Sequence, residues 1–237
     1  CGGKAPAGQV LVKDAIAERG IRVSSIGSPL GKVGIQDDFD AHLKRFGRAL
    51  EVTQFMEAPY IRLFSFFIPL GDDPADHRDE VMRRMQGLVD AAQGSGVVLL
   101  HENEKEIYGD TGARCRDILE TVDDPTLQAA FDFANFVQIG DRPYDDCYGI
   151  LRPYIEYVHV KDALAETGKV VPAGEGDGQV KRILKELLVD DGWTGFLSLE
   201  PHLSEAGKFR GFSGPQLWRT AAQSLKRILD ELGVEYQ

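Results

Sequence analysis

The sequence is poor in cysteine, and its cysteines are not arranged as metal or disulfide pairs. Three occur in 237 residues, at Cys1, Cys115 and Cys147, and no two of them have CxxC spacing. An odd number of widely spaced cysteines predicts neither a disulfide framework nor a thiolate zinc site. This cysteine usage is typical of a reducing compartment, and we expect a cytoplasmic protein.

Long apolar runs and an excess of positive charge are also lacking. No run approaches the roughly 20 apolar residues of a membrane-spanning helix, and no charged-then-apolar leader pattern opens the chain. The formal net charge is −11, whereas a nucleic-acid groove needs a basic surface. We therefore expect neither membrane nor nucleic acid as a partner, but a small molecule.

Short apolar runs alternate with longer amphipathic stretches, a pattern that indicates an α/β fold with a parallel sheet. The length and the 43% hydrophobic content fit one domain over residues 1–237. Six strands are predicted, at Ile21–Ser28, Tyr60–Phe67, Val97–Glu102, Leu127–Asp132, Tyr154–Val160 and Gly195–Glu200. Helices are predicted at Gln9–Arg19, Phe39–Met56, Arg78–Gln93, Thr111–Thr121, Pro143–Arg152, Gln179–Asp190 and Pro215–Leu232.

Four consecutive predicted strands end on a side chain that can bind a metal ion. These residues are Glu102 in LLHENE, Asp132 in AAFDFANF, His159 in EYVHVKD and Glu200 in FLSLEPH. Because the carboxyl ends of the strands in a parallel α/β barrel converge, we expect the four side chains around one point. Three carboxylates and an imidazole suit Mn²⁺, Mg²⁺ or Co²⁺, and the histidine adds Zn²⁺ as a candidate. The sequence therefore predicts one bound divalent metal ion.

Alternation along the strands predicts which other side chains face this site. His159 shares its face with Lys161, which lies just beyond the strand. Arg62 in YIRLFSFF is expected to face the interior together with Phe64 and Phe66. A guanidinium inside a barrel needs an anion, either on the substrate or among the metal-site carboxylates. Three further side chains at strand ends could add to an anion pocket: Ser28, Lys32 and Lys161.

Some of these assignments have alternatives. Glu104 shares a face with Glu102, so either could be the ligand, and Asp132 could instead cap a helix. His101 and His202 each neighbour a predicted ligand. For both, a place beside the site or at the surface is the alternative to a direct role.

The motifs HENE, FDFANF, VHVKD and SLEPHL, together with IGSPLGK at Ile26–Lys32, resemble the xylose-isomerase-like sugar phosphate isomerase/epimerase superfamily. The resemblance runs to Leu203 and implies a (β/α)8 TIM barrel with a Glu–Asp–His–Glu metal site. Six predicted strands are fewer than eight, and the chain opens at Cys1 without a methionine. We therefore expect the first one or two strand–helix units to be lacking in this chain.

The resemblance also implies a reaction. Carbonyl and hydroxyl oxygens of a sugar-like substrate chelate the metal while acids and bases move a proton between adjacent carbons, with Glu102 and Glu200 as the acid/base pair. This predicts a sugar or sugar phosphate isomerase or epimerase. The alternatives are a metal-dependent lyase or dehydratase of an inosose-like substrate, and a non-catalytic truncated barrel. The endonuclease-type branch of the superfamily is disfavoured because the chain has only five histidines.

Two further residues are expected to contact substrate. Many epimerase-type relatives have a histidine three residues after the aspartate ligand, where this chain has Asn135. An amide can bind a hydroxyl but cannot shuttle a proton. Glu175, in the glycine-rich loop Gly174–Gly178, is the second expected contact. An incomplete barrel would expose apolar edges, which favours a homo-oligomer.

Overall fold

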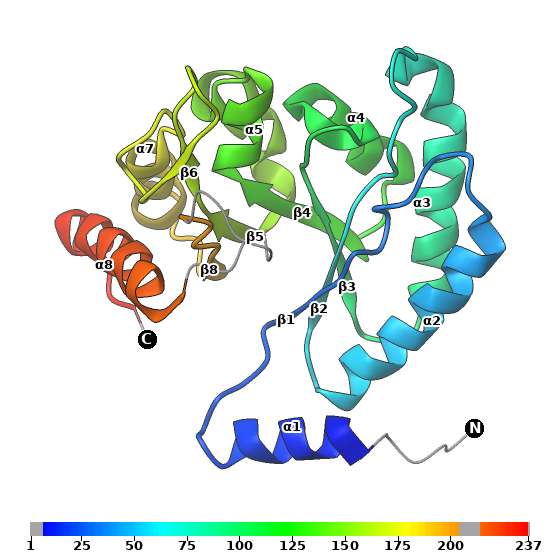
Figure 1. Ribbon diagram of the computed structural model, residues 1–237, viewed down its shortest axis with the longest axis horizontal. Helices are drawn as coiled ribbons and strands as arrows, with labels where there is room; N and C mark the ends of the chain where they lie inside the picture. Colours follow the sequence, from blue (N-terminus) through cyan, green and yellow to red (C-terminus); the bar gives the residue numbers. More distant parts are fainter. Residues whose placement is uncertain (1–6, 204–213, 237) are drawn as a thin grey trace.

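Six parallel strands form the central sheet of the computed structural model, which describes residues 7–203 and 214–236 (Figure 1). Their order in the sheet is β1, β2, β3, β4, β5, β8. The strands are β1 (Ser25–Gly27), β2 (Tyr60–Leu63), β3 (Val98–Glu102), β4 (Leu127–Asp132), β5 (Ile155–Val160) and β8 (Phe196–Leu199). Each predicted strand has its counterpart here, and the parallel α/β class is confirmed. Within the described residues, β1 and β8 each pair on one side only, so the sheet stays open.

Helices follow the strands and cover the outer face of the sheet. In Figure 1, α2, α3 and α4 lie along one flank, α7 and α8 lie at the other, and α1 stands apart beyond the end of α2. The helices are α1 (Ala7–Ala17), α2 (Phe39–Phe55), α3 (Arg78–Ala92), α4 (Gly112–Val122), α5 (Phe133–Ile139), α6 (Gly149–Leu151), α7 (Val180–Leu184) and α8 (Gly214–Leu232). None of the described helices is long and apolar enough to cross a membrane.

Shorter elements complete the connections. A hairpin of β6 (Asp162–Ala163) and β7 (Val170–Val171) follows β5. Short 3-10 helices occur at η1 (Pro74–His77), η2 (Tyr108–Asp110) and η4 (Arg152–Tyr154), and π-helical segments at η3 (Pro143–Tyr148) and η5 (Lys185–Asp190). The continuous helix predicted over Pro143–Arg152 is therefore broken into η3, α6 and the start of η4.

The two faces of the sheet differ as strand alternation requires. Leu99 and Phe131 point outward into the large core shared with the helices, whereas Leu100, Ala130 and Tyr157 form a small cluster on the inner face. Burying the outward side chains stabilises the sheet by roughly 25 cal/mol per Å² of apolar surface removed from water. The inner face is thus left to carry polar side chains at the strand ends.

The predicted inward position of Phe66 is wrong. The strand predicted through Phe67 ends at Leu63, and Phe66 has the left-handed φ of 67°. Its backbone N–H donates to the carbonyl of Gly31, at 3.0 Å, in the loop after β1. This turn breaks the two-residue alternation, so Phe66 packs in the outer core while Arg62, still within β2, keeps the inner face.

Candidate metal centre

Four side chains meet at the carboxyl ends of neighbouring strands. Glu102 ends β3, Asp132 ends β4, His159 lies near the end of β5, and Glu200 follows β8. One ligand atom from each lies within 4.8 Å of those of the other three. Glu102, Asp132 and His159 are buried, and Glu200 is 16% exposed. The structure therefore brings together all four predicted ligands, while their binding of a metal stays a prediction.

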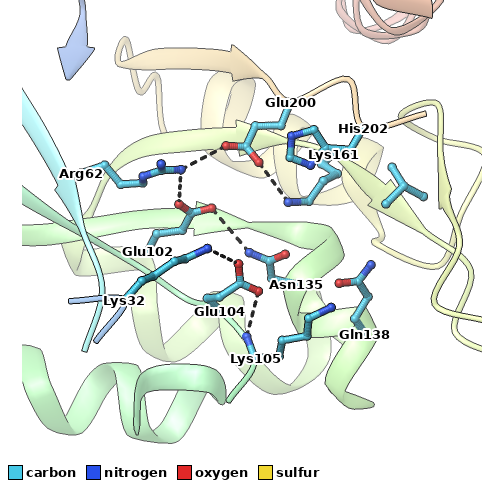
Figure 2. A pocket seen from close by; sticks show the side chains of 11 residues that line it. Lys32, Arg62, Glu102, Glu104, Lys105, Asn135, Gln138, Lys161, Glu200 and His202 are labelled. Carbon is cyan, nitrogen blue, oxygen red and sulfur yellow. Dashed lines mark hydrogen bonds and ion pairs between the residues drawn. The ribbon is translucent and has the colours of Figure 1, made fainter. Parts of the chain in front are cut away.

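Two cationic side chains sit among the carboxylates (Figure 2). Arg62 NH1 lies 2.9 Å from Glu102 Oε2 and 3.4 Å from Glu200 Oε1. Lys161 Nζ lies 2.9 Å from Asp132 Oδ2 and 3.0 Å from Glu200 Oε2. Of the two anions considered for Arg62, the structure pairs it with the metal-site carboxylates.

His159 links two of the carboxylates. Its Nδ1 lies 2.9 Å from Glu102 Oε1 and 3.1 Å from Glu200 Oε1. Burial lowers the pKa of His159, but the two carboxylates outweigh burial and raise that pKa to about 10. Burial raises the pKa of Asp132 to about 7 despite the nearby Lys161. A proton on His159 thus supplies positive charge at the point where the two glutamates converge.

The donor set fits a divalent cation. Three carboxylates and an imidazole are ligands that hard and borderline divalent ions accept. Asp132 Oδ2 is buried, and its ion-pair partner among the described residues is the ammonium of Lys161, 2.9 Å away. A cation bound by these four residues would take over the charge compensation that the proton on His159 provides.

Two asparagines fix the strand ends that carry the ligands. Asn103 Oδ1 accepts from the Asp132 N–H at 2.9 Å, and Asn103 Nδ2 donates to the Asp132 carbonyl at 3.0 Å. Asn135 Nδ2 donates to the Asn103 carbonyl at 2.8 Å and lies 3.5 Å from Glu102 Oε1. Asn103 was not among the predicted site residues, although its position inside HENE, directly after Glu102, was the available signal.

The four-residue cluster opens into a polar pocket of about 390 Å³. Besides Arg62, Lys161, Asn135 and the two glutamate ligands, it is lined by Lys32, Glu104, Lys105, Gln138, Val170 and His202 (Figure 2). Glu104 Oε2 pairs with Lys32 Nζ at 2.9 Å and stands outside the four-residue cluster, which favours Glu102 as the ligand. Lys32 lines the pocket, as a substrate-binding residue would.

The glycine-rich loop is wrapped around one buried carboxylate. Asp162 accepts hydrogen bonds from the N–H groups of Gly174, Gly176 and Gly178, at 2.9, 3.1 and 2.8 Å. Glu175 is exposed, and its Oε1 lies 3.7 Å from the guanidinium of Arg227 in α8. It is not among the residues that line the pocket, so its contact with substrate stays a prediction.

The two histidines beside the ligands differ. His101 is buried, and neither of its ring nitrogens has a hydrogen-bond partner among the described residues. Burial lowers its pKa to about 4, so the ring is neutral. His202 lines the pocket, and burial followed by the charge of Lys161 lowers its pKa.

Similar proteins were found at the level of family and fold. The D-tagatose 3-epimerase-like protein has a TM-score of 0.78 at 16% identity, covering 98% of this chain and 87% of its own. The probable 3-DHS dehydratase AsbF from Bacillus anthracis has a TM-score of 0.73 at 19% sequence identity. The match covers 91% of this chain and 80% of AsbF. A xylose isomerase-like TIM barrel protein from Mycobacterium smegmatis in complex with magnesium has a TM-score of 0.68 at 20% sequence identity. The match covers 96% of this chain and 79% of that protein. No curated protein sequence matches the chain.

The family assignment agrees with the geometry. The sequence model of the xylose isomerase-like TIM barrel matches residues 5–228, which is nearly the whole chain. The solved structures share the barrel fold, and the predicted family and fold class are thereby confirmed. With its parallel strands ending in a cluster of three acids and a histidine, this chain belongs to the xylose isomerase-like TIM barrel family.

Proposed function

We propose that the protein is a divalent-metal-dependent isomerase or epimerase of a small sugar or sugar phosphate. The observation that carries the proposal is the convergence of Glu102, Asp132, His159 and Glu200 within 4.8 Å at one end of the sheet. The pocket above them is polar, as binding of a polyhydroxylated substrate requires. The name of the D-tagatose 3-epimerase-like relative supports the same chemistry.

The four ligands would hold Mn²⁺, Mg²⁺ or Co²⁺, with Zn²⁺ as a further candidate. The relative that was solved with magnesium supports a divalent ion in this kind of barrel. When bound, the ion supplies Lewis acidity, which polarises the substrate's carbonyl and hydroxyl oxygens and acidifies the neighbouring C–H.

The protein's own groups would then move the proton. Burial raises the pKa of Glu102, but His159 and Arg62 lower it below its ordinary value, and Glu200 is shifted in the same direction. Both carboxylates are therefore ionised at neutral pH. One takes the proton from carbon. In isomerisation the same group returns it to the adjacent carbon, whereas in epimerisation the second group delivers a proton to the opposite face of the same carbon. Lys161 Nζ and Asn135 Nδ2 can donate to substrate oxygens.

Elimination of water is the second candidate reaction. It needs a general acid near the leaving hydroxyl, and His202, which lines the pocket outside the ligand set, would supply the proton at acidic pH because its pKa is lowered. The dehydratase among the similar structures favours keeping this alternative. A lyase would release an unsaturated ketone, whose ultraviolet absorbance distinguishes it from an isomerised sugar.

Cellular context stays a prediction. We propose a cytoplasmic enzyme because Cys115 and Cys147 are free and buried; Cys1 lies outside the described residues. A homo-oligomer is also proposed, since β1 and β8 leave open sheet edges within the described residues.

Deuterium exchange tests the proposed reaction. The protein loaded with Mn²⁺ is incubated with a panel of ketoses in D₂O, and deuterium at the carbon next to the carbonyl is followed by NMR. Glu102→Gln should reduce the exchange rate by about 10²-fold or more, because the carboxamide cannot accept a proton. Glu104→Gln is the matched control, since Glu104 lines the same pocket but pairs with Lys32. Exchange that Glu102→Gln leaves unchanged would contradict the assignment.

A further inference from the structure

One pocket cation is not neutralised by a carboxylate. Arg62 and Lys161 are paired with metal-site carboxylates, and Lys32 with Glu104. Lys105 also lines the pocket, and no carboxylate of the described chain lies within ion-pair distance of its ammonium. Figure 2 shows Lys105 and Gln138 together, on the side of the pocket away from Arg62. A free ammonium at this position is available to a ligand.

The charges of the whole site point to an anion. Four cationic side chains line the pocket: Lys32, Arg62, Lys105 and Lys161. Four carboxylates face them, from Glu102, Glu104, Asp132 and Glu200. With His159 deprotonated as a ligand, a bound divalent metal ion would give this balanced set an excess of about two positive charges. A neutral sugar would leave that excess uncompensated, whereas a phosphate or carboxylate group would offset it.

Helix α5 sets the separation between Asp132 and Gln138, the residue beside Lys105. Asp132 caps the helix, with its Oδ1 accepting from the Asn135 N–H at 2.8 Å, and Asn135 and Gln138 follow at steps of three residues. At 1.5 Å per residue, Gln138 lies about 9 Å beyond Asp132 along the helix. A ketose of about six carbons with a terminal anionic group spans this distance, given bonds of about 1.5 Å.

We propose that the substrate is an acidic sugar, bearing a phosphate or a carboxylate, and that Lys105 beside Gln138 binds this anionic group. The inference rests on the proposed function, because the other end of the sugar must reach the metal centre. Lys105 is thus a specificity-determining residue: it selects the charged substrate and takes no part in moving the proton. The Gln138 amide is held by a hydrogen bond to the Gly168 carbonyl at 2.9 Å, which fixes this wall of the pocket.

Calorimetric titration of the Mn²⁺-loaded protein tests the inference. The probes are D-fructose, D-fructose 6-phosphate and D-fructuronate, which differ only in the group at the end of the carbon chain. At least one acidic probe should bind about tenfold more tightly than D-fructose, and the tighter of the two identifies the anion. Lys105→Met should remove this advantage, so that each acidic probe binds about as tightly as D-fructose does. Lys44→Met, an exposed lysine of α2, is the control that should bind all probes like the wild type.

Two results would overturn the inference. One is equal affinity for the neutral and acidic ketoses, and the other is an acidic preference that Lys105→Met leaves intact. If the protein holds metal and exchanges deuterium into D-fructose under either result, only this inference fails and the proposed function stands. If it binds no metal and exchanges no ketose, both fail.

Discussion

The ammonium of Lys161 lies 2.9 Å from Oδ2 of Asp132, and both side chains are almost completely buried. Removing one partner of a buried ion pair leaves the other charge unpaired, at a cost of about 3 kcal/mol or more. We predict that Lys161→Met lowers the free energy of unfolding of the metal-free protein by about that amount. Because the variant removes a positive charge beside the ligands, added Mn²⁺ should stabilise it more than it stabilises the wild type.

Urea unfolding in EDTA and in excess Mn²⁺ measures both effects. Lys44→Met, with no ion pair among the described residues, is the control for loss of a lysine. Equal free energies of unfolding for Lys161→Met and wild type in EDTA would show that the Lys161–Asp132 ion pair does not stabilise the metal-free protein.

The loop around Asp162 should tolerate no side chain at Gly178. A Cβ there would lie 2.6 Å from Asp162 Oδ1 and 3.1 Å from the Cβ of Phe133. Gly178→Ala must displace the carboxylate from its N–H donors, and hydrogen bonds to charged groups contribute about 1.5–3 kcal/mol each. We expect a loss of about 3 kcal/mol in urea unfolding.

The control for that substitution is Gly47→Ala in α2, where a Cβ would meet no atom within 4 Å. It should be neutral or stabilise the helix by up to about 1 kcal/mol. Similar stability of both alanine variants would mean that the Asp162 loop contributes little.

Stability should also depend on the protonation of His42. This ring is buried, and its Nε2 accepts from the Gly31 N–H at 3.2 Å. Burial, followed by the charges of Arg45 and Arg84, lowers the pKa of His42 from 6.5 to about 4. Below about pH 6.5 the His42 ring is therefore protonated in the unfolded chain but stays neutral in the folded protein. The free energy of unfolding falls as the pH is lowered from about 6.5 to about 4.

His42→Gln should weaken this dependence between pH 7 and pH 5. The substitution should not abolish the pH dependence of stability, because burial also lowers the pKa of His101 to about 4. The free energy of unfolding at several pH values gives the slopes. Identical slopes for variant and wild type would exclude His42 as their source.

Much of the fold and the cluster could be predicted because each ligand closes an apolar run. β4 spans Leu127–Asp132 as predicted, and the other five strands of the central sheet lie within their predicted ranges, whereas the hairpin of β6 and β7 was not predicted. Side-chain alternation also placed Arg62 and Lys161 toward the carboxylates. These features depend on local patterns that a sequence displays directly.

The remaining features depend on contacts between distant segments. Alternation failed at Phe66 because the backbone leaves the strand to bond the loop after β1. Helix α5 was missed because it starts directly at Asp132, which serves as strand end and helix cap at once. The hydrogen bonds from the Asn103 side chain to the Asp132 backbone join two strands. The free ammonium of Lys105 is evident only once the ion-pair partners of the other pocket cations are known.

Metal content tests the central claim most directly. Elemental analysis compares the purified chain with a Glu200→Gln, His159→Ala double variant, each incubated with excess Mn²⁺ and then freed of unbound ion. We predict about one divalent ion per wild-type chain and a loss of that ion in the variant. No bound metal in either protein would contradict the proposed metal centre and the enzymatic function built on it.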